Sequence, residues 1–148
     1  MRRRAAGLAI AAALLALAAP APAADAPAIS PGEWEITVTT EMRGLPVEVP
    51  PPVPMTFTSC VTPENPVPVQ PQPGSQCSIL ETKAQGDTVT WRFRCEDGQG
   101  GSYEGSGRIV YGSDRFEGEQ TMNVTGTGDA PITMANKMKG RRLGPCKE

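Results

Sequence analysis

Histidine is missing from this sequence of 148 residues. Histidine is the most common general base, the usual partner of a catalytic serine or cysteine, and a main zinc ligand. Its absence therefore excludes the familiar hydrolytic triads. Phosphate-binding loops are missing as well, because the closely spaced glycines, such as Gly105 and Gly107, lie within segments patterned as strands and do not precede a helix. We interpret these glycines as bulges or as places of close backbone approach.

An excess of positive charge is also missing, since 14 Lys and Arg residues are balanced by 16 Asp and Glu residues. Three of the positive charges lie at residues 2–4, directly before an uncharged run over residues 5–24. This order is typical of a secretory signal peptide, and the small residues at 21–23 predict that residues 1–23 are cleaved off. The remaining chain is more acidic, which disfavours nucleic-acid binding.

No apolar run is strong enough for a stable membrane helix, which needs ~20 predominantly apolar residues. The run over residues 5–19 is short and mostly alanine, and no cysteine that could carry a lipid anchor follows it closely. The arginines lack the continuation of a twin-arginine signal, so we expect export by the general secretory route. The prediction is a periplasmic domain, residues 24–148, with no transmembrane segment after signal cleavage.

Alternation of apolar and polar residues predicts that this domain is all-β. The first predicted strand, residues 33–42, places Trp34, Ile36 and Val38 on one face. The six further strands are expected at residues 55–61, 77–84, 88–95, 102–111, 115–124 and 132–143. Seven strands joined mostly by short turns predict an antiparallel meander that closes as a small barrel or folds over as a sandwich.

Proline is concentrated in the first half of the domain, in two predicted loops at residues 44–54 and 62–74 that flank one short strand. Proline has no backbone N–H for a strand ladder, so these stretches are expected to be edges, loops or polyproline-like segments. Long excursions of this kind are often functional. They could equally be surface loops that only stay rigid and resist proteases.

Four cysteines allow three disulfide pairings. A hairpin that folds about Gly86 places Cys77 and Cys95 equally far before and after the turn, so we predict that these two face each other and form a disulfide. Cys60 then pairs with Cys146. The wide spacing of the thiols and the lack of a Cys-x-x-Cys motif disfavour redox or metal chemistry.

No side chain is marked as catalytic. The carboxylates that a two-acid glycosidase could use fall on the polar phase of their strands, so we expect a non-enzymatic protein without a cofactor. We predict instead that a sheet face or barrel interior binds a small apolar ligand. The expected lining residues are large and share the inward phase; they are Trp34, Trp91, Tyr103, Phe116 and Met122. The same residues could equally be plain core.

Two other functions stay open. The proline-rich loops have stiff backbones that suit the docking of an envelope protein. Five methionines after the signal peptide could hold copper(I) through their thioethers, although most share the phase of apolar strand residues, which favours core packing. These methionines are Met42, Met55, Met122, Met134 and Met138.

Four segments together resemble the bacterial domain of unknown function 3617 family. They are Pro31-Gly32-Glu33-Trp34-Glu35-Ile36, Cys60-Val61-Thr62-Pro63-Glu64, the strand from Trp91 to Cys95, and Met138-Lys139-Gly140-Arg141-Arg142-Leu143-Gly144-Pro145-Cys146. The resemblance covers nearly the whole domain and implies a disulfide-bonded β domain in the periplasm. It implies no activity and no functional residues.

Overall fold

The computed structural model describes residues 28–45, 47–69, 74–96, 98–124 and 131–147. The predicted signal peptide, residues 1–23, lies outside these ranges, as do one residue of the first proline-rich loop and residues 70–73 of the second.

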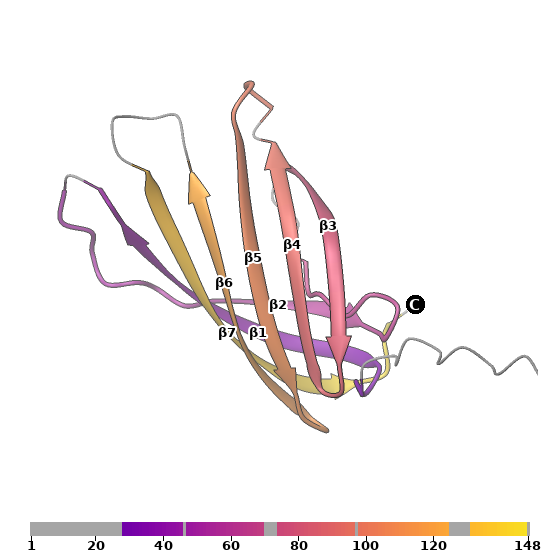
Figure 1. The fold of residues 1–148 in the computed structure, drawn as a ribbon. Helices are drawn as coiled ribbons and strands as arrows, with labels where there is room; N and C mark the ends of the chain where they lie inside the picture. Colours follow the sequence, from indigo (N-terminus) through magenta and orange to yellow (C-terminus); the bar gives the residue numbers. More distant parts are fainter. Residues whose placement is uncertain (1–27, 46, 70–73, 97, 125–130, 148) are drawn as a thin grey trace, which may run out of the picture.

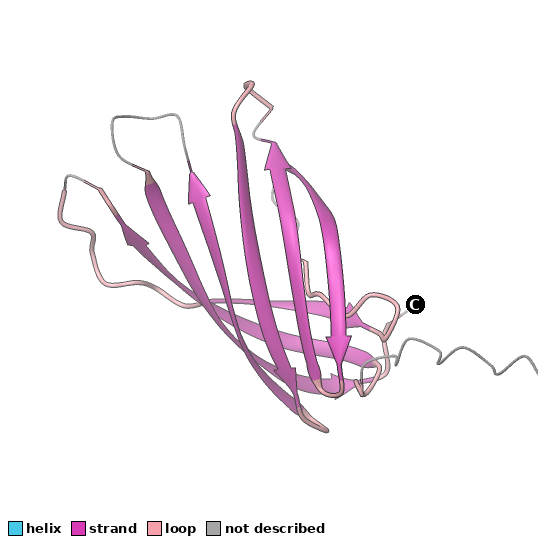
Figure 2. Ribbon diagram, viewed as in Figure 1, coloured by secondary structure: helices cyan, strands magenta, loops and turns pink. Residues whose placement is uncertain are grey.

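Seven strands and no helix are present in the described part of the chain (Figures 1 and 2). They are β1 Gly32–Arg43, β2 Met55–Val61, β3 Gln76–Gln85, β4 Thr88–Glu96, β5 Ser102–Tyr111, β6 Arg115–Val124 and β7 Ile132–Gly144. The predicted all-β class and the seven strands are confirmed.

All seven strands belong to one antiparallel sheet with the order β2-β1-β7-β6-β5-β4-β3. The meander runs from β3 to β7, after which β1 pairs with β7 and β2 pairs with the outer side of β1. The sheet curls into a half-barrel whose edges are β2 and β3, and the strand direction turns progressively from β3 to β1 (Figure 1). The connection from β2 to β3 therefore has to pass from one edge to the other.

Alternation along the strands gives the sheet an apolar concave face. Its buried core consists of Ile29, Trp34, Ile36, Val61, Val89, Trp91, Phe93, Cys95, Ile109, Tyr111, Phe116 and Met138. Burying a side chain such as Ile36 or Ile109 contributes roughly 1.5–3 kcal/mol each. Trp34, Tyr111 and Phe116 form an aromatic cluster with ring centroids 5.2–5.7 Å apart.

The convex face carries charged side chains that pair across neighbouring strands. Lys137 and Arg141 of β7 contact Glu41 and Glu35 of β1, with N–O distances of 3.0 and 2.9 Å. The hydrogen bond and the charge of Lys137 lower the pKa of Glu41. Because side chains alternate along each strand, these charges lie on the solvated side of the sheet, away from the concave face.

Both predicted disulfides are present, Cys60–Cys146 and Cys77–Cys95. The reasoning that led to the second one was partly wrong. A turn centred on Gly86 would place Ala84 opposite Thr88, whereas the structure pairs Ala84 with Val89. A register shift between Ile79 and Glu81 then restores the expected pairing of Cys77 with Cys95. The bulge adds one residue to β3 alone, so the inward phase of this strand changes from odd positions, Cys77 and Ile79, to the even position Ala84.

Candidate functional site

A cavity of about 430 Å³ lies on the concave face. All seven strands and the β2–β3 connection contribute to its apolar lining, with one residue each from β1, β2 and β5. The apolar lining residues are Val38, Phe57, Val67, Pro68, Val69, Ile79, Trp91, Phe93, Tyr103, Met122, Val124, Met134 and Met138, with the Cys77–Cys95 disulfide. The polar lining residues are Gln120 and Asn136. This volume falls within the range of pockets that hold small molecules.

Two glycines of β5 help to keep this space open. Gly107 lies directly opposite Trp91, and Gly105 lies opposite Phe93. A Cβ at either glycine would collide with the aromatic ring of the facing residue. The rings of Trp91 and Phe93 therefore occupy the space above the β5 backbone that a side chain would fill and extend less far into the half-barrel. This is the close backbone approach expected for the Gly-Ser-Gly segment.

The structure divides the five predicted lining residues into two groups. Trp91, Tyr103 and Met122 line the cavity. Trp34 and Phe116 do not; they are 0% and 2% exposed and belong to the aromatic cluster. They share the inward phase of the others but sit farther along the concave face, where the core is packed.

The second proline-rich loop forms part of the cavity wall. Its described part, residues 62–69, is here named the strap. Pro66 and Pro68 are buried, and the Tyr111 hydroxyl donates a hydrogen bond of 2.6 Å to the carbonyl of Pro66. Burial raises the pKa of Tyr111 well above its usual value. The strap therefore packs against the concave face, while the first loop exposes Val47 and Val53.

A polar row runs from β1 to β6, and two of its three residues, Asn136 and Gln120, lie within the apolar lining of the cavity. Thr40 of β1, Asn136 of β7 and Gln120 of β6 are consecutive cross-strand partners, and we name them the amide row. The Thr40 hydroxyl donates a 2.7 Å hydrogen bond to Oδ1 of Asn136. Sequence reasoning missed these residues. The available signal was an amide at an inward position between apolar residues, as Gln120 is between Phe116 and Met122.

The five methionines differ in how deeply their side chains are buried. Only Met138 belongs to the buried core, whereas Met122 and Met134 are half-buried on the cavity wall and Met42 and Met55 are exposed. Core packing therefore explains Met138 and, because its side chain packs against the buried core, Met122. Met42, Met134 and Met122 are consecutive cross-strand partners, which places three thioether side chains in one row.

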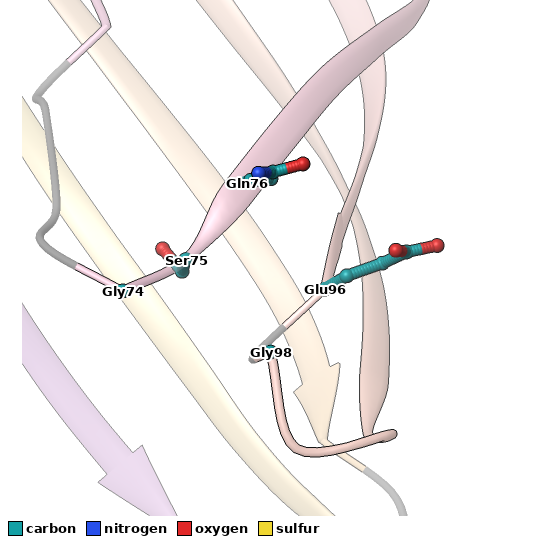
Figure 3. A pocket seen from close by; sticks show the side chains of 5 residues that line it. All are labelled: Gly74, Ser75, Gln76, Glu96 and Gly98. Atoms are coloured by element: carbon teal, nitrogen blue, oxygen red, sulfur yellow. The ribbon is translucent and has the colours of Figure 1, made fainter.

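A second hollow of about 430 Å³ lies at the start of β3 and the end of β4 (Figure 3). It is lined by Gly74, Ser75, Gln76, Glu96 and Gly98. In Figure 3 the side chains of Gln76 and Glu96 point away from the two glycines, and the Ser75 hydroxyl points to the other side. These polar groups do not converge on one point, so the concave cavity is the better candidate site.

The described ranges contain no cluster of three or more histidine, cysteine, aspartate or glutamate side chains able to hold a metal ion. Nor do they contain a helix long and apolar enough to cross a membrane.

Comparison with known proteins gives a single match. No curated protein and no solved structure is similar to the chain. The model of a protein family described as a protein of unknown function (DUF3617) matches residues 29–146. This range begins just before β1, ends at Cys146 and includes every strand, both disulfides and the whole cavity wall. The chain therefore belongs to the DUF3617 family.

Proposed function

We propose that this protein is a non-enzymatic binding domain that holds a small apolar ligand in the concave cavity. The observation that carries the proposal is the cavity itself: it holds about 430 Å³, and its lining within the described ranges is mostly apolar and includes no charged residue. Soluble domains rarely leave large apolar surfaces uncovered unless the surface binds something.

The surroundings of the cavity also favour binding over catalysis. Glu104, Glu117 and Glu119 are exposed and are absent from the cavity lining. General acid or base catalysis needs a proton-transferring side chain within hydrogen-bond reach of the reacting group, and none of these carboxylates is so placed. The amide row can bind and orient a ligand through hydrogen bonds, but side-chain amides do not ionise near neutral pH and therefore cannot act as general acids or bases.

We also propose that the domain works in the periplasm after removal of residues 1–23. The support is the predicted signal peptide together with the two disulfides, which form and persist in oxidising compartments. Intact-mass analysis of the protein recovered from a periplasmic extract tests this. The expected chain is 24–148 with both disulfides formed; a chain that retains the first 23 residues and is recovered only from the cytoplasm would contradict it.

The binding proposal is tested with N-phenyl-1-naphthylamine, an apolar dye whose fluorescence rises when it leaves water. The oxidised domain should bind the dye, and Met122→Arg should weaken binding at least tenfold, because a charge is costly in an apolar wall. Thr121→Arg is the matched control, since Thr121 is the exposed neighbour of Met122 on the convex side. Equal weakening by both variants, or no dye binding at all, would refute the proposal.

Docking of an envelope protein is a second candidate, favoured by the exposed apolar side chains of the first proline-rich loop. Val47, Val49 and Val53 are 66%, 43% and 80% exposed. Deletion of residues 47–54 should abolish cross-linking to such a partner and leave dye binding unchanged. Copper(I) binding through the row of Met42, Met134 and Met122 stays a prediction. Copper(I) titrations of the unchanged domain and of the Met134→Leu variant would check it, and the variant should bind more weakly.

A further inference from the structure

We propose that the natural ligand is an uncharged amphiphile, with an amide group that both the Asn136 and the Gln120 side chains bind. This inference rests on the proposed binding function and specifies its ligand class. It depends on where the amide row lies, how its groups are hydrogen-bonded, and which charges are kept away from it.

The amide row lies between two apolar rows of the concave face. On one side of Asn136 and Gln120, the pair Met138 and Gly118 occupies β7 and β6; on the other side lie Met134 and Met122. Opposed residues on adjacent strands have Cβ atoms about 5 Å apart, so the Asn136 and Gln120 amides can both reach one ligand group. An apolar chain can then extend along the concave face on both sides of that group.

The hydrogen bond from Thr40 determines which groups of Asn136 are free. It occupies Oδ1 of Asn136, so the Nδ2 group remains as a donor for a ligand. The Gln120 side chain has no hydrogen-bond partner within the ranges that the structure describes. Its Oε1 can therefore accept from a ligand N–H. Both amides are half-buried, and a ligand in the cavity would remove water from them, so a ligand that hydrogen-bonds to both gains affinity and specificity.

A secondary amide matches this pair better than other common polar groups. Its carbonyl accepts from Asn136 Nδ2 and its N–H donates to Gln120 Oε1, whereas an ester can only accept. A carboxylate would lose hydration without meeting a cation, because none of the described residues that line the cavity is charged. Lys137 follows Asn136 directly in the sequence and could neutralise a ligand carboxylate. Its side chain, however, is exposed and paired with Glu41 on the convex face.

The test uses three probes with the same ten-carbon acyl chain: N-methyldecanamide, methyl decanoate and decanoate. Each displaces N-phenyl-1-naphthylamine from the oxidised domain. One net hydrogen bond corresponds to about a fivefold change in affinity, so the amide should bind about fivefold more tightly than the ester. Decanoate at pH 8 should bind more than tenfold more weakly than the amide.

Variants of the amide row should change these preferences in different ways. Gln120→Met should remove the preference for amide over ester, because only the amide donates to Gln120. Asn136→Leu should weaken the amide and the ester alike, by about fivefold, because both accept from Asn136. The matched control is Asn123→Leu, since Asn123 accepts a 3.1 Å hydrogen bond from Thr133 in the same kind of cross-strand pair but is exposed on the convex face.

Several outcomes would overturn the inference. If the dye binds but amide, ester and carboxylate compete equally, the ligand class is wrong while the proposed function stands. If no probe and no dye binds, both fail. If Asn123→Leu changes the amide preference as much as Gln120→Met does, the effect is a general loss of sheet stability. A thermal melt of each variant confirms folding, and loss of the amide preference in a folded Gln120→Met variant supports the inference.

Discussion

The Cys60–Cys146 disulfide is expected to contribute about 5 kcal/mol to the free energy of unfolding. It closes a loop with a sequence separation of 86. On the chain-entropy model, closing a loop of this length lowers the conformational entropy of the unfolded chain and destabilises the unfolded state by about that free energy. Cys60 is exposed and Cys146 only half-buried, so replacing both by alanine removes the covalent bond with little loss of packing. Total stabilities of small domains are 5–15 kcal/mol. The double variant should therefore be close to its unfolding threshold.

Urea unfolding followed by tryptophan fluorescence measures this difference directly, with the oxidised domain as the reference. The Cys77→Ala/Cys95→Ala variant provides a comparison, because its loop has a sequence separation of only 18 and should contribute about 3 kcal/mol. Cys95 is 1% exposed, so that variant also loses some packing. The entropy argument would be refuted if Cys60→Ala/Cys146→Ala lowered the free energy of unfolding by less than about 2 kcal/mol, with both the variant and the oxidised domain natively folded before urea is added.

Three further predictions concern single side chains. Tyr111→Phe should cost about 1–3 kcal/mol in the free energy of unfolding, because it leaves a buried carbonyl of the strap without its hydrogen bond; urea unfolding measures the loss. Gly107→Val should cost about 1–3 kcal/mol and shift the emission of Trp91, whose ring occupies the space of the new side chain. Glu41 should titrate below 4.5 by NMR, and Lys137→Met should raise its pKa again. Because folding lowers this pKa, the stabilisation is present above the unfolded-state value and is lost as the pH falls through the folded-state value.

Neighbouring positions on the convex face provide the controls. Ser106→Val changes the exposed residue next to Gly107, and it should leave both stability and tryptophan emission nearly unchanged. An equal loss for Ser106→Val and Gly107→Val would contradict the contact with Trp91. For the titration, Lys139→Met removes an exposed cation from the same strand, and an equal shift of the Glu41 pKa would show that its partner is not Lys137 specifically.

Local features of the fold were predictable because they depend on alternation. The bounds of β5 and β6 and the opposition of Cys77 to Cys95 agree with the sequence-based prediction. The pairing of β1 with β7 was not predictable. Alternation shows which face of a strand is apolar, but it contains no information on which distant strand lies beside it.

Composition was a poor guide to the candidate site for a similar reason. A proline-rich segment is expected on the surface, yet Pro66 and Pro68 are buried because the strap has to cross between the two edges of the half-barrel. Large size and inward phase also could not separate Trp91, on the cavity wall, from Trp34, in the aromatic cluster. That distinction depends on the position along the barrel axis, which only the strand register determines.

The pairing of β1 with β7 has a consequence for the order in which the domain folds. In the strand order, β7 lies between β1 and the rest of the sheet, so β1 and β2 can pair only with each other until β7 is in place. The distance along the chain is long: the Glu35–Arg141 ion pair between β1 and β7 joins residues 106 positions apart. Such long-range pairings make folding slow. During this interval Cys60 is without Cys146, while the β3–β4 hairpin, which forms between neighbouring strands, already places Cys77 opposite Cys95. Early closure of the hairpin disulfide therefore protects the chain, because it removes the two wrong partners that Cys60 would otherwise meet.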